Sequence, residues 1–256
     1  MTKTVLSEDV EEGLRLVTLN RPHRLNAIVP ALLEDLVEAL EAAERAAHIR
    51  CIILTGAGRA FCAGDDLREF DSQTGDAAST RAYVERIQDV TRAIMLGSKP
   101  VIGAIRGWAV GGGLEWMINC DFAIAATGSR FFFPEISLGL FVTGAATELL
   151  PRLVGLQRAR ELILLGERFD ADRALAWGLL HKVVADDELM PTALALARRL
   201  AALPQARVRD LRRILTRRAG LDAAMAAETE ATVSGFLDPE TAKRAAAFGS
   251  RLQPRP

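Results

Sequence analysis

Apolar and polar residues alternate with two different periods along the first two thirds of the chain. Short runs of mostly apolar, often β-branched residues predict strands at 14–19, 51–55, 101–106, 121–126, 131–133 and 181–184. From Pro30 to about Glu41, apolar residues recur every three or four positions and acidic residues occupy the opposite face, which predicts a helix. Because strands and helices interleave up to about residue 185, this part is predicted to be α/β.

The pattern changes after residue 186, where the strand signals end. Three or four helices rich in Ala and Leu are predicted there, with breaks at Pro204, Gly220 and Gly235. Asp238 followed by Pro239 is typical of a helix start, because Asp accepts from the first free N–H groups and Pro fits the first helical position. The segment from Asp71 to Thr80, rich in Ser, Thr, Asp and Gly, is predicted to be the most mobile internal part.

Composition narrows the functional classes. The chain has 256 residues, of which 50% are hydrophobic, and 32 Lys and Arg stand against 33 Asp and Glu. This balance is typical of a globular protein and gives no overall positive field for a nucleic acid or an anionic membrane. No apolar run reaches the roughly 20 residues that span a bilayer, and the acidic N-terminus lacks the apolar stretch of a secretory signal. We therefore expect neither a nucleic acid nor a membrane as partner.

Cysteine and histidine spacing adds two expectations. Cys51, Cys62 and Cys120 stand in apolar surroundings and are odd in number, which favours reduced, packed thiols and a cytoplasmic location. The three histidines lie far apart with no metal-ligand spacing, so no metal site is predicted.

Three familiar catalytic motifs do not occur. The chain has no Gly-x-Ser-x-Gly elbow and no Gly-x-x-x-x-Gly-Lys loop, which disfavours a serine hydrolase of that type and a P-loop nucleotidase. Gly56-Ala57-Gly58 follows a predicted strand, but Phe61 stands where a dinucleotide fingerprint has its third glycine. A Rossmann site is therefore disfavoured as well.

Two glycine-containing segments each lead from a predicted strand toward a predicted helix. Phe61 to Leu67 precedes a helix expected from about Asp66, and Val110 to Glu115 opens a second, apolar helix. A helix start has unpaired N–H groups and a positive dipole end, and Gly lets a ligand approach closely. Each segment alone is better explained as a tight turn. Their joint occurrence after two strands indicates an anion hole.

Two glutamates stand in the least polar parts of the sequence. Glu115 is followed by Trp116-Met117-Ile118, and Glu135 follows three phenylalanines and a proline. Either one alone is explained by helix capping or by a turn. Neither explanation accounts for the apolar surroundings, which would raise the pKa of a carboxyl toward the range useful for proton transfer.

The motifs match one known family as an ordered set. They are Leu19-Asn20-Arg21-Pro22, Leu25-Asn26-Ala27, Phe61 to Leu67, Lys99-Pro100-Val101-Ile102, Gly107 to Glu115, Cys120-Asp121, Pro134-Glu135 and Trp177-Gly178-Leu179. In this order and spacing the sequence resembles the enoyl-CoA hydratase/isomerase, or crotonase, superfamily. The resemblance runs from about Leu14 to His181 and continues more weakly to the end.

The resemblance implies an α/β fold with a crotonase-type ββα spiral core at residues 1–190. A helical region at 191–256 would contact neighbouring subunits in a homotrimer or homohexamer. The implied partner is an acyl-CoA substrate, whose thioester carbonyl would accept hydrogen bonds from the N–H groups of Asp65 and Gly112. Hydratases of the family add two glutamates, which here would be Glu115 as base and Glu135 as acid. CoA is part of the substrate, and no further cofactor is implied.

Hydration of a 2-enoyl thioester fits these groups chemically. The addition places negative charge on the carbonyl oxygen, so two fixed N–H donors stabilise the enolate more than the substrate. One carboxylate takes a proton from the attacking water and a carboxylic acid delivers a proton to Cα, which gives syn addition. The resemblance places the contacts to the CoA thioester at Arg24, Asn26, Ala63, Asp66, Leu67, Arg68 and Gly111. For each arginine a solvated surface position is an equally good interpretation.

Two departures from the family pattern stand out. Members usually carry Ala, Gly or Ser at the position of Asp65, so only its backbone N–H could serve, and its side chain is expected to cap a helix beginning at Asp66. Val142-Thr143-Gly144-Ala145-Ala146 replaces a turn that is usually rich in Pro and Gly. A reshaped acyl pocket would follow.

Two alternative functions remain open. A double-bond isomerase needs only one carboxylate to move a proton between carbons, so the presence of two acids favours the hydratase. A binding protein for RNA is suggested by Ala206 to Ala219, which carries six arginines and one aspartate. The balanced overall charge and the lack of interleaved aromatic residues argue against RNA.

Overall fold

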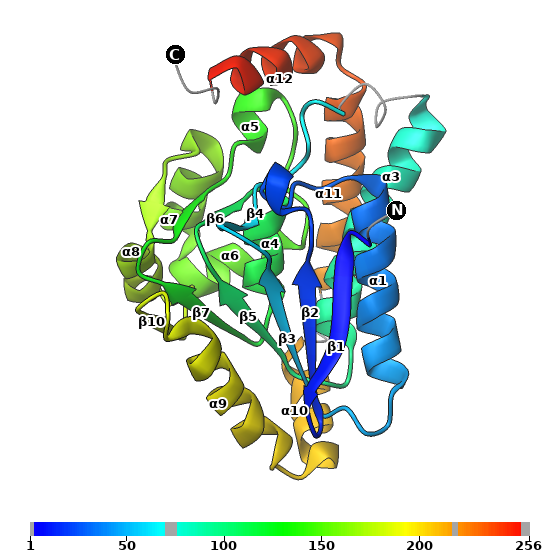
Figure 1. Ribbon diagram of the computed structural model, residues 1–256. Coiled ribbons are helices and arrows are strands. Elements are labelled where there is room, and N and C mark those ends of the chain that lie inside the picture. Colours follow the sequence, from blue (N-terminus) through cyan, green and yellow to red (C-terminus); the bar gives the residue numbers. More distant parts are fainter. Residues whose placement is uncertain (1–2, 70–75, 217–219, 252–256) are drawn as a thin grey trace.

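A six-stranded sheet lies at the centre of the molecule (Figure 1). The computed structural model describes residues 3–69, 76–216 and 220–251. The strand order is β1-β2-β3-β5-β7-β10, and all neighbours are parallel except β1 and β2. The strands are β1 (Val5–Glu11), β2 (Leu14–Leu19), β3 (Cys51–Gly56), β5 (Val101–Ile105), β7 (Phe122–Ala126) and β10 (Lys182–Val184).

A second, smaller sheet has four short strands in the order β4-β6-β8-β9. They are β4 (Ala60–Cys62), β6 (Trp108–Val110), β8 (Arg130–Phe132) and β9 (Phe169–Asp170). The first three are parallel neighbours, and β9 is antiparallel to β8.

The chain builds both sheets in a repeating order. Three successive segments each add one strand to the large sheet, one strand to the small sheet and then a helix: β3-β4-α3, β5-β6-α4 and β7-β8-α5. The helices are α3 (Ala77–Leu96), α4 (Gly112–Asn119) and α5 (Glu135–Leu138). This arrangement is the ββα spiral expected from the sequence.

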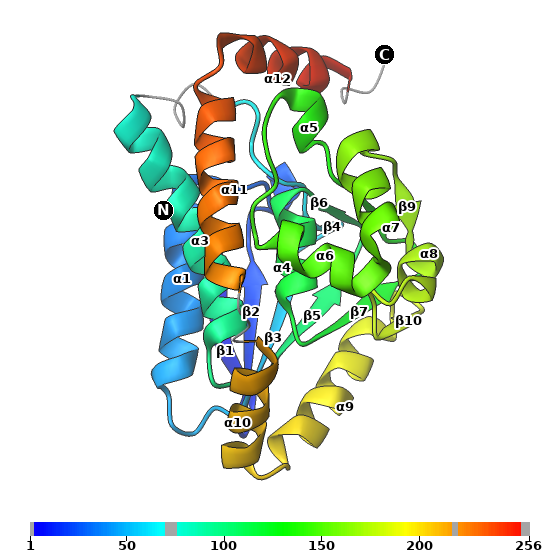
Figure 2. The ribbon, with the colours of Figure 1, turned by 180° about the vertical axis from the view of Figure 1, so that it is seen from behind.

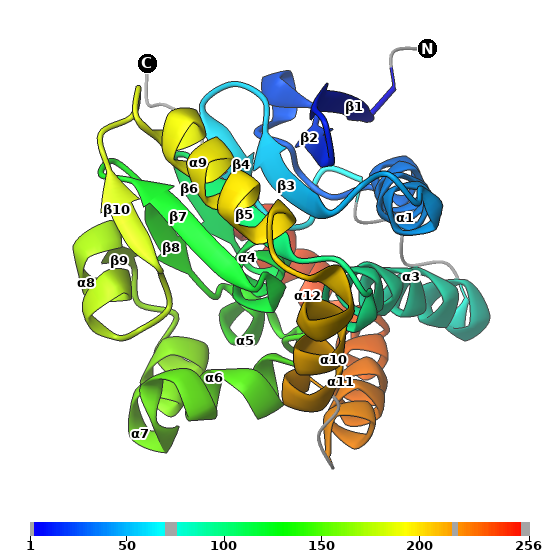
Figure 3. The ribbon, with the colours of Figure 1, turned by 90° about the horizontal axis from the view of Figure 1, so that it is seen from below.

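Helices cover both faces of the large sheet because successive strand residues point to opposite sides. α1 (Pro30–Arg45) begins at Pro30, as predicted, and buries Leu36 in the same cluster as Leu54 of β3. The neighbouring Ile53 points the other way, into a cluster closed by Leu196 of α9 (Leu189–Ala201). Figure 3 shows α9 lying across the strands.

The C-terminal part is helical, as predicted. α10 (Gln205–Thr216), α11 (Leu221–Phe236) and α12 (Pro239–Arg251) follow α9, and α11 runs along α3 while α12 contacts α5 (Figure 2). Between α5 and α9 the chain forms further helical segments, which alternate near the end with β9 and β10. They are α6 (Ala146–Val154), α7 (Leu156–Arg160), a π-helical turn (Glu161–Leu165) and α8 (Ala171–Ala176). A short 3-10 turn (Pro22–Arg24) follows β2.

Several expectations need correction. Strands β1, β4, β6 and β9 were not predicted. Only Val5 of the first five residues of β1 is buried, and β4, β6 and β9 have three residues or fewer, which is too short for a clear alternation. The predicted helix break near Gly235 is found directly after it, since α11 ends at Phe236 and α12 begins at Pro239. Gly235 itself lies in the last turn of α11, where an added Cβ would come within 2.5 Å of the Gly139 carbonyl oxygen. Of the segment predicted to be mobile, 71–75 lie outside the described residues, whereas Asp76 caps α3 and Thr80 is buried in it.

The arginine run on α10 is partly internal. The Nε of the buried Arg212 donates to Asp121 Oδ1 at 2.8 Å, and another nitrogen of its guanidinium donates to the Ile94 carbonyl at 2.9 Å. Arg207 pairs with Asp210 on the same helix. Within the described ranges, none of the helices has the length and apolar character needed to cross a bilayer.

An apolar stripe on α10 predicts self-association. The side chains of Leu211, Ile214 and Leu215 are 58%, 67% and 53% exposed, and neighbouring apolar side chains exposed in this way typically form a subunit contact. We expect a trimer or hexamer in light scattering at micromolar concentration, and a smaller species for Ile214→Glu. Leu6→Glu, on the edge strand β1, is the matched control and should leave the mass unchanged. A monomeric wild-type protein would contradict the prediction.

Candidate active site

Three chain segments meet at one edge of the small sheet. β4, β6 and β8 are parallel neighbours, so their carboxyl ends point in the same direction. Asp65 follows β4, Gly111 to Glu115 follow β6, and Glu135 follows β8. Side chains and N–H groups that are distant in the sequence are therefore brought together, as the resemblance implies.

The backbone at this edge offers two N–H donors. Gly112 is the first residue of α4, where an N–H has no intrahelical acceptor. Among the residues that the structure describes, neither the Asp65 N–H nor the Gly112 N–H donates to a backbone carbonyl. An added Cβ on Gly113 would come within 2.5 Å of the Cys62 carbonyl oxygen, so this glycine allows the start of α4 to pack against the end of β4.

The side chain of Asp65 does not cap a helix, because no helix begins at Asp66. Asp65 instead pairs with Ile28 in a β-bridge, and the carboxylate of Asp66 forms an ion pair with the buried Arg21 at 3.2 Å. Asp65 Oδ1 accepts a hydrogen bond of 2.7 Å from the hydroxyl of Tyr83 on α3. Burial raises the pKa of Asp65 to about 6, although the Tyr83 hydrogen bond favours its ionised form.

Glu115 is buried on α4 and has a hydrogen-bond donor at each oxygen. The Thr143 N–H donates to Oε1 at 2.8 Å, and the Thr143 hydroxyl donates to Oε2 at 2.5 Å. Burial raises the pKa of Glu115 to about 8, while both hydrogen bonds act in the opposite direction because they stabilise the carboxylate. Gly144 lies so close that an added Cβ would be 2.6 Å from the Glu115 Cβ.

Glu135 is the first residue of α5 and has a different environment. Its Oε2 is buried and has no hydrogen-bond partner among the described residues. Burial, reinforced by the charge of Glu115, raises its pKa well above the ordinary value of a glutamate. An added Cβ on Gly111 would overlap Glu135 Oε1, so this position must stay free of a side chain. The two carboxyls thus differ in their surroundings: Thr143 donates to both oxygens of Glu115, which favours its ionised form, whereas Glu135 Oε2 has no donor among the described residues.

All the remaining predicted contacts to CoA except Gly111 lie on two segments that run side by side. The Ala63 N–H donates to the Leu25 carbonyl, and the Ile28 N–H donates to the Gly64 carbonyl. Arg24 and Arg68 are exposed on these segments. Ala63 and Leu67 are half-buried, Asp66 is engaged by Arg21, and the Gly111 N–H donates to Phe132.

Asn26 serves the fold with its side chain. The Asn26 amide group donates to the Ala57 and Ala60 carbonyls at 3.0 and 2.8 Å, and its Oδ1 accepts from the Arg21 N–H at 2.8 Å. Because the side chain of Asn26 is engaged within the protein, any contact between Asn26 and a ligand would come from its backbone. No group of three or more His, Cys, Asp or Glu in the described part of the chain is arranged to hold a metal ion.

Three polar residues near the site were missed by sequence reasoning: Tyr83, Thr143 and Glu228. Thr143 lies 28 residues after Glu115, a separation with no periodic relation to it. Tyr83 is the single tyrosine of the chain, and this was the one signal in the sequence that could have drawn attention to it. Glu228 stands among alanines and threonines on α11. A glutamate in such a sequence is usually a solvated helix residue, so nothing in the sequence indicated that Glu228 is buried.

The sequence is similar to a known family and to several named proteins. The family model described as enoyl-CoA hydratase/isomerase matches residues 9–249. A 1,2-epoxyphenylacetyl-CoA isomerase from Escherichia coli (strain K12) is 42% identical over 80% of this chain and 78% of its own length. A short-chain-enoyl-CoA hydratase from Clostridium acetobutylicum is 35% identical over 86% of this chain and 85% of its own.

Solved structures agree in fold. An enoyl-CoA hydratase/isomerase from Xanthobacter autotrophicus Py2 superposes with a TM-score of 0.88 at 30% identity, covering 98% of this chain and 99% of that one. An enoyl-CoA hydratase from Mycobacterium avium subsp. paratuberculosis K-10 gives 0.86 at 27% identity and 98% coverage of both chains. The fold predicted from the resemblance is thereby confirmed.

The tight packing of Gly144 on Glu115 predicts a strong effect of one methyl group. Gly144 has a φ of +65° and no space for a Cβ, so Gly144→Ala should lower the free energy of unfolding by about 2 kcal/mol or more. Gly128→Ala is the matched control, because nothing lies within 4 Å of its Cβ position. Urea unfolding of both variants measures the difference, and equal effects would contradict the packing described.

Proposed function

The chain belongs to the enoyl-CoA hydratase/isomerase family, and within it we propose that the protein adds water to 2-enoyl-CoA thioesters and releases 3-hydroxyacyl-CoA. The observation that carries this proposal is the pair of unequal buried carboxyls. Thr143 donates two hydrogen bonds to Glu115, whereas Glu135 Oε2 has no partner among the described residues. Hydration needs such a pair, one group ionised and one protonated.

Each group has a defined task in the proposed reaction. The N–H groups of Asp65 and Gly112 hold the thioester oxygen and stabilise the enolate that forms on it. Glu115 takes a proton from water as the water oxygen bonds to Cβ, and Glu135 gives its proton to Cα. Water supplies both the hydroxyl group and the net proton, so the reaction is redox-neutral and we propose no cofactor beyond the CoA of the substrate.

The alternative is a double-bond isomerase. The relative from Escherichia coli carries an isomerase name at 42% identity, and a relative from Clostridium acetobutylicum carries a hydratase name at 35%. An isomerase needs one carboxyl to remove and return a proton, and the second buried carboxyl would then have no chemical task. The cost of burying a second titratable group favours the hydratase.

We also propose a cytoplasmic location. The support is that Cys51, Cys62 and Cys120 are all free, and burial raises the pKa of each thiol. Unpaired thiols of this kind are typical of a reducing compartment.

Substitution of each glutamate tests the proposed roles. Glu115→Gln and Glu135→Gln should each lower kcat for crotonyl-CoA hydration by about 100-fold or more, with little change in binding of CoA esters, because both act in the transition state. Absorbance of the enoyl thioester follows the reaction. If one glutamate were dispensable and 3-enoyl-CoA were converted rapidly to 2-enoyl-CoA without 3-hydroxyacyl-CoA, the isomerase alternative would be correct.

A contrast between two oxyanion variants tests the use of backbone donors. Asp65→Ala keeps its N–H and should leave kcat within about tenfold of wild type, whereas Gly112→Pro removes an N–H and should lower kcat by about 100-fold or more. Circular dichroism controls for folding of both. Equal losses would mean that the Asp65 carboxyl takes a direct part in the reaction.

The pH dependence follows from the two raised pKa values. Glu115 must be ionised, so kcat/KM should rise with pH as this group, with a pKa of about 8, loses its proton. Glu135 must be protonated, and its pKa is raised well above the ordinary value, so the rate should fall at still higher pH. The pair titrates together, and the two limbs report apparent values. A rate that is already constant below neutral pH would contradict this assignment.

A further inference from the structure

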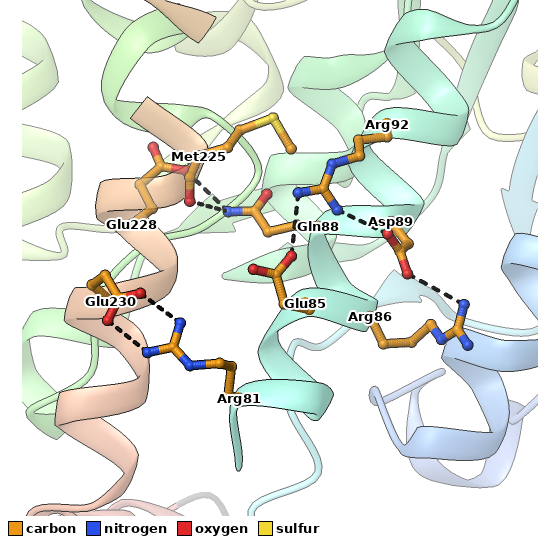
Figure 4. A network of polar contacts seen from close by, with 9 residues as sticks. All are labelled: Arg81, Glu85, Arg86, Gln88, Asp89, Arg92, Met225, Glu228 and Glu230. Carbon is orange, nitrogen blue, oxygen red and sulfur yellow. Dashed lines mark hydrogen bonds and ion pairs between the residues drawn. The ribbon is translucent and has the colours of Figure 1, made fainter. Parts of the chain in front are cut away.

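Glu228 is a further carboxyl buried near the site, and the proposed reaction does not use it. Glu228 lies on α11 and is 1% exposed. Figure 4 shows it facing Gln88 of α3, whose amide nitrogen is 3.4 Å from Glu228 Oε2 and 3.3 Å from the Met225 carbonyl. Burying this group is costly unless its oxygens are hydrogen-bonded, so the identity of its other partners matters.

Those partners are the N-terminal groups of α6. Oε2 accepts from the Ala145 N–H at 2.9 Å, and Oε1 accepts from the Thr147 N–H at 2.8 Å and the Thr147 hydroxyl at 2.6 Å. Ala145 is the N-cap residue directly before this helix, and its methyl side chain cannot accept these bonds. Glu228 therefore caps α6 from another helix, where a negative charge is favoured.

The capped segment also carries the residue that binds Glu115. Thr143 lies two residues before Ala145, and both of its donors reach Glu115. Between them, Gly144 packs directly on the Glu115 side chain. Ala145 has a φ of +56°, which L-residues rarely adopt, so this turn depends on contacts from outside it. Asn119 provides one, by donating to the Gly144 carbonyl at 2.7 Å, and Glu228 provides the others.

We propose that Glu228 is a positioning residue for Glu115: by fixing Ala145 and Thr147, it holds Thr143 where both of its donors meet the Glu115 carboxylate. This inference rests on the proposed function in taking Glu115 as the base. Glu228 touches neither substrate nor the reacting atoms. Its contribution passes through the turn at 143–145, which connects α11 to α4.

Glu228 acts on the ionisation of Glu115 in two opposite ways. The titratable groups whose charges raise the pKa of Glu115 are Glu228 from α11 and Asp65 after β4, and Glu135 from α5 is coupled to it. Loss of the Glu228 charge alone would therefore lower the pKa of Glu115. Loss of the Thr143 hydrogen bonds would raise it, and these bonds have the larger influence. The direction of the change thus distinguishes positioning from charge.

Glu228→Gln is the main variant and Glu230→Gln is its matched control. A glutamine has only one acceptor oxygen for four donors, so the variant disturbs the turn. Glu230 lies two residues further on α11, is exposed, and pairs with Arg81 of α3 at 2.7 Å, away from the turn (Figure 4). We expect Glu228→Gln to lower kcat by about tenfold to 100-fold with little change in KM, and to move the acid limb of the kcat profile to higher pH. Glu230→Gln should change neither.

A double-mutant cycle tests whether the effect passes through Thr143. Thr143→Val removes the hydroxyl donor to Glu115, so it should also move the acid limb to higher pH. If Glu228 acts through Thr143, the two losses in kcat should not multiply in the double variant. Thr147→Val keeps Glu228 and removes one of its donors. Thr147→Val should lower kcat and move the acid limb to higher pH as Glu228→Gln does, but by smaller amounts. It replaces Glu228→Gln as the test if that variant does not fold.

Titration of Glu115 by carboxyl ¹³C NMR, assigned by comparison with Glu115→Gln, gives a second readout that does not depend on the reaction. A raised pKa of Glu115 in Glu228→Gln supports the proposal. The proposal would be overturned if the pKa of Glu115 were unchanged or lowered in Glu228→Gln, or if the acid limb of the kcat profile did not move to higher pH. It would also be overturned if the losses in kcat of Glu228→Gln and Thr143→Val multiplied in the double variant. If the wild-type protein does not hydrate enoyl-CoA while the titration moves as expected, the proposed function fails and the positioning role remains.

Discussion

Two carboxyl groups buried at one site repel each other, and the rest of the active-site architecture depends on how that repulsion is resolved. Burial raises the pKa of both Glu115 and Glu135, and the charge of Glu115 raises the pKa of Glu135 further. Thr143 breaks the symmetry, because its N–H and hydroxyl both donate to Glu115. A single residue in a turn thus makes the two carboxyls unequal, and the proposed acid and base roles rest on that difference.

The arrangement requires that the two glutamates lie together and that Thr143 is held against Glu115, and different parts of the fold meet these two requirements. Parallel strands β4, β6 and β8 bring the N–H donors and both glutamates to one sheet edge. The turn that carries Thr143 is held by Asn119 of α4, which belongs to the spiral, and by Glu228 of α11, which lies outside it. The C-terminal helix α11 is therefore connected to the site through two hydrogen-bonded steps, although it contributes no group to the proposed reaction.

Local sequence signals located β2, β3, β5, β7, β8 and β10, the helix α1, both glutamates and the glycines of α4. Apolar runs, helix caps and apolar neighbours are encoded within a few residues, whereas β4, β6 and β9 are too short to give such a signal. They failed where a distant partner decides the structure. Asp65 forms a bridge to Ile28 and Asp66 forms an ion pair with Arg21, and no helix begins at Asp66. Thr143 and Glu228 act only through contacts across the fold, so no local pattern marked them.

If the two carboxyls add water across a double bond, the oxygen of that water must appear in the product. Isotopic labelling of the product measures this directly. Crotonyl-CoA incubated with the wild-type protein in D₂O containing H₂¹⁸O would be analysed by mass spectrometry and NMR. The account predicts 3-hydroxybutyryl-CoA with ¹⁸O at Cβ and one deuterium at Cα. Deuterium exchange or a moved double bond without incorporation of ¹⁸O would contradict it, because one carboxyl alone is enough for that chemistry.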